Sequence, residues 1–267
     1  MANAAITRTS DAKPGDGYVQ SFARGLEVIR SFSASAPRQT LTEVAGRSGL
    51  SRAGARRILL TLQTLGYVES DGRLFSLTPR ILDLGFAYLS SMPIWNLAEP
   101  VMHELVEQVK ESCSAAVLEG TDIVYVLRVP TQKIKSISLG VGSRLPAYCT
   151  SMGRMLLSAL PEEEMMQRLQ TAHPTARTKH TVTDIKELTA RIAQVRKQGW
   201  SLVNQELEEG LVSMAAPITN RAGQAVAALN ISGQANRTSA KAMQDTMLPQ
   251  LLAAAQQISR LLSLQRA

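Results

Sequence analysis

The sequence predicts an α+β protein with an N-terminal winged helix-turn-helix, a linker helix and a larger second domain. Two amphipathic helix patterns separated at Gly49, followed by the hairpin turn Asp71-Gly72, predict the winged unit. From about residue 94 onward, short strands follow one another with helices placed around them. That order favours an α+β domain over a doubly wound sheet, in which strands and helices alternate regularly.

The winged unit is expected to open with a helix within residues 21–36. Phe22, Leu26 and Ile29 recur there at helical spacing and predict its inner face. A short amphipathic helix over 41–45 follows. These two segments provide the support against which a DNA-reading helix would pack.

The third expected helix is capped by Ser51 and extends to about residue 65. Its apolar residues predict a buried stripe, made of Ala55, Ile58, Leu59, Leu62 and Leu65. In a helix-turn-helix, the N-terminal half of this helix enters the major groove. The opposite face and the hairpin carry the residues expected to contact DNA, which are Ser51, Arg52, Ala53, Arg56, Arg57, Thr64 and Arg73.

The charge distribution supports double-stranded operator DNA as a partner. Residues 1–92 hold 11 Lys+Arg against 7 Asp+Glu, whereas residues 93–267 hold 18 against 15. The basic excess per residue is therefore higher in the N-terminal third, as binding of a polyanion requires. The alternative is a three-helix structural domain whose arginines only solvate its surface. The hairpin and the three arginines close to the cap favour DNA binding.

Composition also predicts a compartment. Residues 1–19 are polar and lack the apolar stretch of a signal peptide, so a disordered tail is expected there. Cys113 and Cys149 have no CxxC spacing, which favours two free, buried thiols in a reducing environment. No run approaches the length that spans a membrane. The sequence therefore predicts a cytoplasmic protein with no membrane partner.

Residues 79–93 are expected to form a linker helix between two domains, with residues 20–78 before it and 94–267 after it. This segment is more apolar than a solvated linker requires. Such a helix usually packs on something, and a second copy of the chain is the simplest candidate, giving a dimer or tetramer. Packing on the winged unit is the alternative.

The second domain is expected to contain helices and strands in a fixed order. They are a helix at 97–110, strands at 114–118, 123–129 and 134–139, a loop at 140–146, helices starting near 151 and 162, a helix at 184–198, strands at 200–203, 213–218 and 225–231, and a helix at 239–264.

The most promising anion site in this domain is the helix start at residues 150–153, where backbone N–H groups and the helix dipole favour negative charge. An ordinary capped helix is the alternative. Asn230 and Ser232 alternate with apolar neighbours and would share one face of a strand, buried or solvated. Arg128 and Arg144 could each pair a carboxylate, although a surface position suits arginines at strand and loop ends.

Four phrases carry a resemblance to a known family: FARGLEV at 22–28, LTPRILDLG at 77–85, ESCSAAVL at 111–118 and LPAYCTSMGR at 145–154. With the order of the segments from Tyr18 onward, they resemble the IclR family of bacterial transcription regulators. They look particularly like the branch that regulates the β-ketoadipate pathway and related aromatic-acid catabolism. The resemblance implies a GAF-like effector-binding domain, a dimerising linker and a dimer or tetramer.

The resemblance also implies an effector site for a small carboxylate at the 150–153 turn. Carried over by position, the family pocket corresponds to Ser151, Met152, Gly153, Glu206, Ser213, Asn230 and Ser232. The implied effector is an aromatic carboxylate or a ring-cleavage dicarboxylate. The implied function is regulation of an aromatic-acid catabolic operon, with RNA polymerase as a further partner if the regulator activates.

Catalysis, cofactors and metals are not expected. The chain has no GxSxG, HExxH or CxxC motif, and Gly140-Val141-Gly142 lacks the third glycine of a dinucleotide fingerprint. His103, His173 and His180 are scattered without metal-ligand spacing. Two alternatives remain: a ligand-independent oligomeric DNA-binding repressor and an enzyme acting on a small organic acid.

Overall fold

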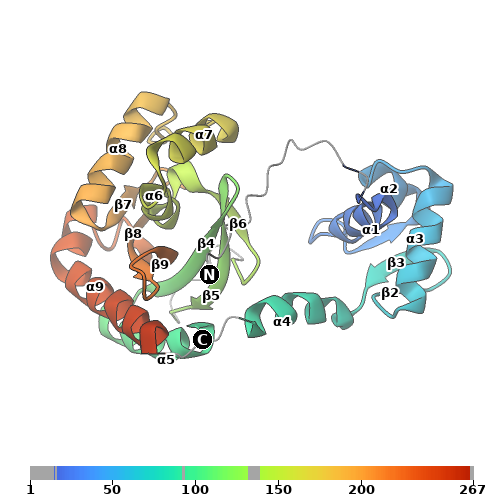
Figure 1. The fold of residues 1–267 in the computed structure, drawn as a ribbon, viewed down its shortest axis with the longest axis horizontal. Coiled ribbons are helices and arrows are strands. Elements are labelled where there is room, and N and C mark those ends of the chain that lie inside the picture. The colour runs from blue at the N-terminus through green and yellow to red at the C-terminus, as the bar shows by residue number, and fades with distance from the viewer. Residues whose placement is uncertain (1–14, 16, 92–93, 132–138, 265–267) are drawn as a thin grey trace. The chain divides into compact units, whose positions relative to one another are not determined.

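A computed structural model describes residues 15, 17–91, 94–131 and 139–264 of this protein. The chain divides into two compact units between Tyr88 and Leu89 (Figure 1). Three expectations fall partly outside the described residues: most of the tail at 1–19, the last two linker residues, and the strand at 134–139 up to residue 138.

The first unit packs three helices on a three-stranded antiparallel sheet (Figure 1). The helices are α1 (Gln20–Arg30), α2 (Leu41–Arg47) and α3 (Arg52–Thr64), and the strands in spatial order are β1 (Arg38–Thr40), β3 (Leu74–Leu77) and β2 (Val68–Ser70). Strands β2 and β3 form the predicted hairpin, and β1 is a short strand that the sequence did not predict. The winged helix-turn-helix is confirmed.

Local sequence explains how this unit is organised. Thr40 and Glu43 form a capping box at the start of α2: the Glu43 N–H donates to the Thr40 hydroxyl at 3.3 Å, and the Thr40 N–H donates to the Glu43 carboxylate at 2.7 Å. The unit closes around a core of Val28, Val44, Ala45, Ala55, Leu59, Leu62 and Val68. Every helix and one strand therefore contribute to a single core.

Two details of the predicted packing are wrong. Phe22 and Leu26, expected on the inner face of α1, are 69% and 36% exposed, because that helix reaches the core mainly from Val28 onward. Leu65 is 50% exposed because it follows the last residue of α3, where the chain turns away. Hydrophobic spacing identified both helices but not the residue at which each leaves the core.

The linker begins with a 3-10 turn, η1 (Pro79–Ile81), which leads directly into α4 (Leu82–Ser90). The Thr78 hydroxyl donates to the Gly66 carbonyl at 2.5 Å, so the start of the linker is fastened to the turn after α3. Four large hydrophobic side chains of α4 are exposed in the single chain, namely Leu82, Leu84, Phe86 and Tyr88.

The second unit is a six-stranded antiparallel sheet between two helical layers (Figure 1). In spatial order the strands are β6 (Arg144–Pro146), β5 (Asp122–Val129), β4 (Ser112–Glu119), β9 (Ala225–Gln234), β8 (Leu211–Thr219) and β7 (Ser201–Asn204). One layer contains α5 (Ile94–Val109) and α9 (Ala240–Leu264); the other contains η2 (Ala147–Cys149), α6 (Ser151–Ser158), α7 (Glu162–Ala172) and α8 (Ile185–Gln198). Because the described strand pairs are antiparallel, the α+β prediction is confirmed.

Side chains of β9 alternate between the two helical layers. Leu229 and Ile231 belong to the core beneath α5 and α9, whereas Ala228 belongs to the core beneath α6, α7 and α8. Asn230 and Ser232 therefore share one face, as the alternation predicted, and that face lies toward the α6 layer. Polar side chains are thus placed under the start of α6, on the face of the sheet where the anion site was expected.

Strand β6 lies within residues 140–146, where the sequence predicted only a loop. Its Leu145 stands opposite Ile123 of β5 in an antiparallel ladder. Pro146 and the nearby glycines favoured the loop interpretation, but an edge strand tolerates proline because one of its sides needs no ladder hydrogen bonds.

Candidate functional site

One face of α3 is exposed and basic. The predicted DNA-contact residues are all exposed on α3 or in the hairpin: Ser51, Arg52, Ala53, Arg56, Arg57, Thr64 and Arg73. The Ser51 hydroxyl accepts a hydrogen bond from the Gly54 N–H at 3.2 Å, so Ser51 is the helix cap. In the described part of the chain, Arg52, Arg56 and Arg57 form no ion pair. Their charges are available to a polyanion.

The tip of the hairpin is held by Asp71. One carboxylate oxygen accepts the N–H groups of Arg73 at 3.0 Å and Leu74 at 2.8 Å, and the other accepts the Arg38 guanidinium at 2.5 Å. The two backbone hydrogen bonds, with a smaller contribution from Arg38, lower the pKa of Asp71. Asp71 thus stays ionised and fixes the turn that presents Arg73.

In the second unit, helix α6 begins inside the protein. The Thr150 hydroxyl accepts a hydrogen bond from the Gly153 N–H at 3.2 Å, so Thr150 rather than Ser151 is the cap. Ser151 is 1% exposed, and its hydroxyl oxygen has no hydrogen-bond partner among the described residues. A buried hydroxyl without a partner is costly, so it indicates a place for a ligand or a water molecule.

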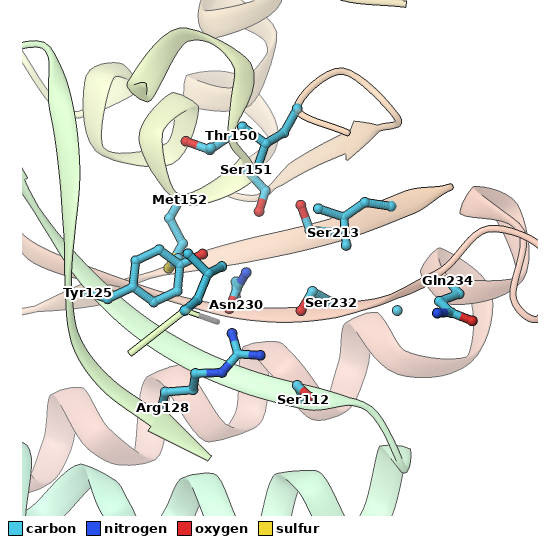
Figure 2. A pocket seen from close by; sticks show the side chains of 14 residues that line it. Ser112, Tyr125, Arg128, Thr150, Ser151, Met152, Ser213, Asn230, Ser232 and Gln234 are labelled. Carbon is cyan, nitrogen blue, oxygen red and sulfur yellow. The ribbon is translucent and has the colours of Figure 1, made fainter. Parts of the chain in front are cut away.

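A cavity of about 60 Å³ lies between this helix start and the sheet (Figure 2). One water molecule needs roughly 10–15 Å³ by the same measure, so the cavity has room for several waters or a small acid. Its lining consists of Ser112, Tyr125, Arg128, Leu139, Thr150, Ser151, Met152, Leu207, Leu211, Ser213, Asn230, Ser232, Gly233 and Gln234. None of these described lining residues is acidic.

The floor of the cavity presents hydrogen-bond donors. The Asn230 side-chain oxygen accepts the Ser114 N–H at 3.1 Å, which leaves the Asn230 amide nitrogen on the cavity side (Figure 2). The Ser112 hydroxyl accepts the Thr131 N–H at 3.1 Å and retains its own proton to donate. Together with the unpartnered Ser151 hydroxyl, these groups suit an acceptor-rich ligand such as a carboxylate.

Arg128 is the one charged residue among those described in the lining. Its guanidinium points into the cavity from β5, next to Tyr125 (Figure 2). Burial raises the pKa of Tyr125 to about 12, and the positive charge of Arg128 acts in the opposite direction. Tyr125 therefore remains neutral at physiological pH, and the cavity as described carries a net positive charge.

Two of the predicted effector residues lie outside the cavity lining. A Cβ atom on Gly153 would stand 2.2 Å from the Ala147 carbonyl oxygen, so close packing of α6 on η2 explains this glycine. Glu206 is 4% exposed, and Arg154 holds its carboxylate at 2.6 and 2.7 Å. The other predicted residues do line the cavity: Ser151, Met152, Ser213, Asn230 and Ser232.

The sequence did not show which of two candidate arginines lines the cavity, and it did not identify Ser112. Arg128 and Arg144 were equivalent candidates in the sequence, but Arg144 pairs with Asp122 at 3.2 Å and is not among the described residues that line this cavity. Ser112 stands opposite Ser232 in the ladder between β4 and β9. Only the strand register, which the sequence does not reveal, places Ser112 beside the predicted serine.

The described residues offer no sign of two other classes of site. No group of three or more histidine, cysteine or acidic residues there is arranged to hold a metal ion. None of the helices described is both long and apolar enough to cross a membrane. Cys113 and Cys149 are free and buried as expected, and burial raises the pKa of the Cys149 thiol to about 11.

Two family models match the chain. The bacterial transcriptional regulator IclR C-terminal domain matches residues 86–260, and the IclR helix-turn-helix domain matches residues 21–72. The Pca regulon regulatory protein of Pseudomonas putida is 45% identical over 242 residues, which cover 90% of this chain and 83% of that protein.

Two solved structures are similar as well. A regulator-like protein of Rhodococcus sp. RHA1 superposes with a TM-score of 0.82 at 47% identity, over 92% of this chain and 98% of that one. The inducer-binding domain of the PobR transcription factor from Acinetobacter, a double mutant in complex with 3-hydroxybenzoic acid, superposes with a TM-score of 0.59 at 30% identity. The superposition covers 62% of this chain and 98% of the PobR domain.

Proposed function

This chain belongs to the IclR family of bacterial transcriptional regulators, and from that premise we propose that it is a ligand-responsive regulator of an aromatic-acid catabolic operon. It binds operator DNA through α3 and the hairpin, and a small carboxylate in the cavity. The observation that carries the effector role is the cavity itself, where an unpartnered buried hydroxyl, an amide and an arginine converge without any acidic side chain.

The effector is an aromatic carboxylate or a ring-cleavage dicarboxylate. This class is supported by the name of the 45% identical Pca regulon protein and by the 3-hydroxybenzoic acid bound to the PobR domain. Its physical support is the donor-rich lining, which satisfies a carboxylate better than a neutral ligand. The residues proposed to contact the effector are Ser151, Met152, Ser213, Asn230 and Ser232, together with Arg128.

On DNA, the proposed contacts are those of the exposed α3 face and the hairpin: Ser51, Arg52, Ala53, Arg56, Arg57, Thr64 and Arg73. A helix-turn-helix of this kind reads two half-sites as a dimer. The exposed apolar side chains of α4 support self-association through the linker, as a dimer or tetramer. RNA polymerase is a partner if the effector-bound protein activates transcription.

The proposed domain boundaries are residues 20–78 for the winged unit, 79–93 for the linker and 94–267 for the effector-binding domain. The protein acts in the cytoplasm, where its DNA is, and performs no catalysis. Family members are regulators of transcription, and the described cavity presents no paired acid and base.

The direct test is operator binding with and without effector. An operator is obtained by selecting DNA sequences on the purified protein, and its affinity is measured by fluorescence anisotropy in the presence of benzoates, hydroxybenzoates, phthalates and aliphatic dicarboxylates. We expect one class of acid to change operator affinity severalfold in a saturable manner. Operator affinity that stays the same with every acid would favour the ligand-independent repressor. Turnover of an acid would establish the enzyme instead.

A further inference from the structure

Glu206 takes part in a buried ion pair behind the cavity. The Arg154 guanidinium donates two parallel hydrogen bonds to its carboxylate, at 2.7 and 2.6 Å, and the side chains are only 2% and 5% exposed. The same guanidinium donates through Nε to the Tyr148 carbonyl at 2.8 Å. The Val182 N–H donates to the Glu206 carboxylate at 3.1 Å. Each of the two buried charges therefore has hydrogen-bond partners within the protein.

This ion pair connects the two parts of the cavity's upper wall. Arg154 belongs to α6, whose first turn contributes Ser151 and Met152 to the lining. Glu206 belongs to the turn between β7 and β8, which contributes Leu207. One bidentate contact, between residues 52 positions apart in sequence, thus joins these two lining segments, in addition to the packing of Leu207 on the apolar cluster that contains Met152.

The β7–β8 turn has an unfavourable backbone conformation and is held by several contacts. Gln205 has a φ of 60°, a left-handed conformation that a non-glycine side chain disfavours. Only external hydrogen bonds hold its carbonyl and that of Glu206: Thr178 donates to the first and Thr181 to the second, both at 2.6 Å. These contacts and the ion pair add to hydrogen bonds inside the turn, in which the Gln205 N–H donates to the Leu211 carbonyl at 2.7 Å and the Gly210 N–H donates to the Gln205 side-chain oxygen at 3.0 Å.

We propose that Arg154 and Glu206 are positioning residues for effector binding. Their ion pair holds the β7–β8 turn over the cavity, so that Leu207 and the start of α6 enclose the ligand from both sides. Neither residue touches the ligand. Replacing a buried ion pair by apolar side chains often leaves stability unchanged, so a purely structural role does not by itself explain the pair. The proposal rests on the effector site proposed above.

The test compares three full-length variants by hydrogen exchange without any ligand. Arg154→Met combined with Glu206→Leu removes the pair without leaving an unpaired charge, and Thr181→Val removes one hydrogen bond from the same turn. Arg191→Ala is the matched control, because Arg191 is 45% exposed and its bond to Glu206, at 3.3 Å, lies outside the bidentate pair. We expect faster exchange at residues 205–211 in the first two variants, while α5 and α9 keep the wild-type rate.

The second readout is ligand affinity, with 3-hydroxybenzoate and adipate as probes. If the turn occupies its closed position a tenth of the time in the double variant, the dissociation constant rises about tenfold, while Arg191→Ala leaves it unchanged. Wild-type exchange at 205–211 in the double variant would overturn the proposal, as would wild-type affinity. If neither probe binds the wild type, the proposed effector class fails, and the exchange experiment still decides the positioning role.

Discussion

Helices α3 and α6 begin in the same way and in opposite surroundings. Each has a capping hydroxyl followed three positions later by glycine, Ser51 to Gly54 and Thr150 to Gly153, and in each the glycine N–H donates to the cap at 3.2 Å. The α3 start is exposed and carries arginines. The α6 start is buried against a sheet and carries Ser151, whose hydroxyl has no partner among the described residues.

Under the proposed function, the difference teaches how one local motif would serve two kinds of anion. On an exposed surface a helix start contributes little against water and salt, so binding of a polyanion depends on several cations and on counterion release. In a buried site a hydroxyl, an amide and one guanidinium suffice, because the low dielectric strengthens each interaction. Substitutions at the two helix starts should therefore differ in size and in their dependence on salt.

The largest effect is expected on the exposed side. Arg56→Ala combined with Arg57→Ala removes two unpaired cations, each contributing about 1–3 kcal/mol to DNA binding, so operator affinity should fall by at least about 30-fold. The slope of affinity against salt should also decrease, by about one for each phosphate that is no longer neutralised. Anisotropy over a salt series measures both. Arg30→Ala, which removes an arginine paired with Glu27 on α1, should change neither.

Arg128→Ala tests the buried side. Loss of a charge-assisted hydrogen bond costs about 1.5–3 kcal/mol, so the effector dissociation constant should rise roughly 10- to 100-fold. Operator affinity of the ligand-free protein should stay the same. Arg144→Ala is the control, since this arginine pairs with Asp122 outside the cavity lining. Titration calorimetry measures effector affinity in both variants. An equal loss of affinity in Arg128→Ala and Arg144→Ala would show that Arg128 does not contact the effector.

Ser151→Ala sharpens the comparison because it should weaken effector binding without lowering the stability of the protein. The hydroxyl has no partner among the described residues, so its removal should leave the free energy of unfolding unchanged or slightly higher. Effector binding should weaken about fivefold, the scale of one neutral hydrogen bond. Denaturant unfolding and calorimetry on the same variant check both. A destabilised protein with normal affinity would mean that the hydroxyl serves the fold.

The last prediction concerns the two caps, whose removal should change stability and not ligand affinity directly. Ser51→Ala should cost about 1 kcal/mol of stability, as for an ordinary exposed cap. Thr150→Ala should cost about 1 kcal/mol more, because it leaves the Gly153 N–H buried without a partner. Hydrogen exchange followed separately in α3 and α6 measures each loss. Equal losses would show that burial does not distinguish the two helix starts.

The sequence predicted both helix starts because a cap is a local signal, readable from Ser51 or Thr150 and the residues that follow. It also predicted that Asn230 and Ser232 share a face, since strand alternation is local too. It did not predict which arginine enters the cavity: Arg128 and Arg144 differ only in what the fold brings near them.

Glu206 shows the same limit. The sequence offers an acid in the right stretch of chain, but its partner Arg154 lies 52 positions away. The resemblance implied that Gly153 belongs to the effector pocket, whereas the structure explains this glycine by the nearby carbonyl of Ala147. Phe22 and Leu26 fit the helical pattern of α1 yet stay exposed, because the extent of a helix–helix contact depends on where neighbouring elements end. Long-range register and the length of a packing interface are not encoded in spacing.

The measurement that tests the central claim most directly is thermal unfolding of the wild type and of Arg128→Ala against aromatic monocarboxylates, aromatic dicarboxylates and aliphatic dicarboxylates. An acid that binds only the folded protein adds about 2.7 kcal/mol at about 100 times its dissociation constant. We expect one class to raise the unfolding temperature of the wild type and to have a much smaller effect on the variant. No shift with any acid, or equal shifts in both proteins, would contradict a carboxylate site in this cavity.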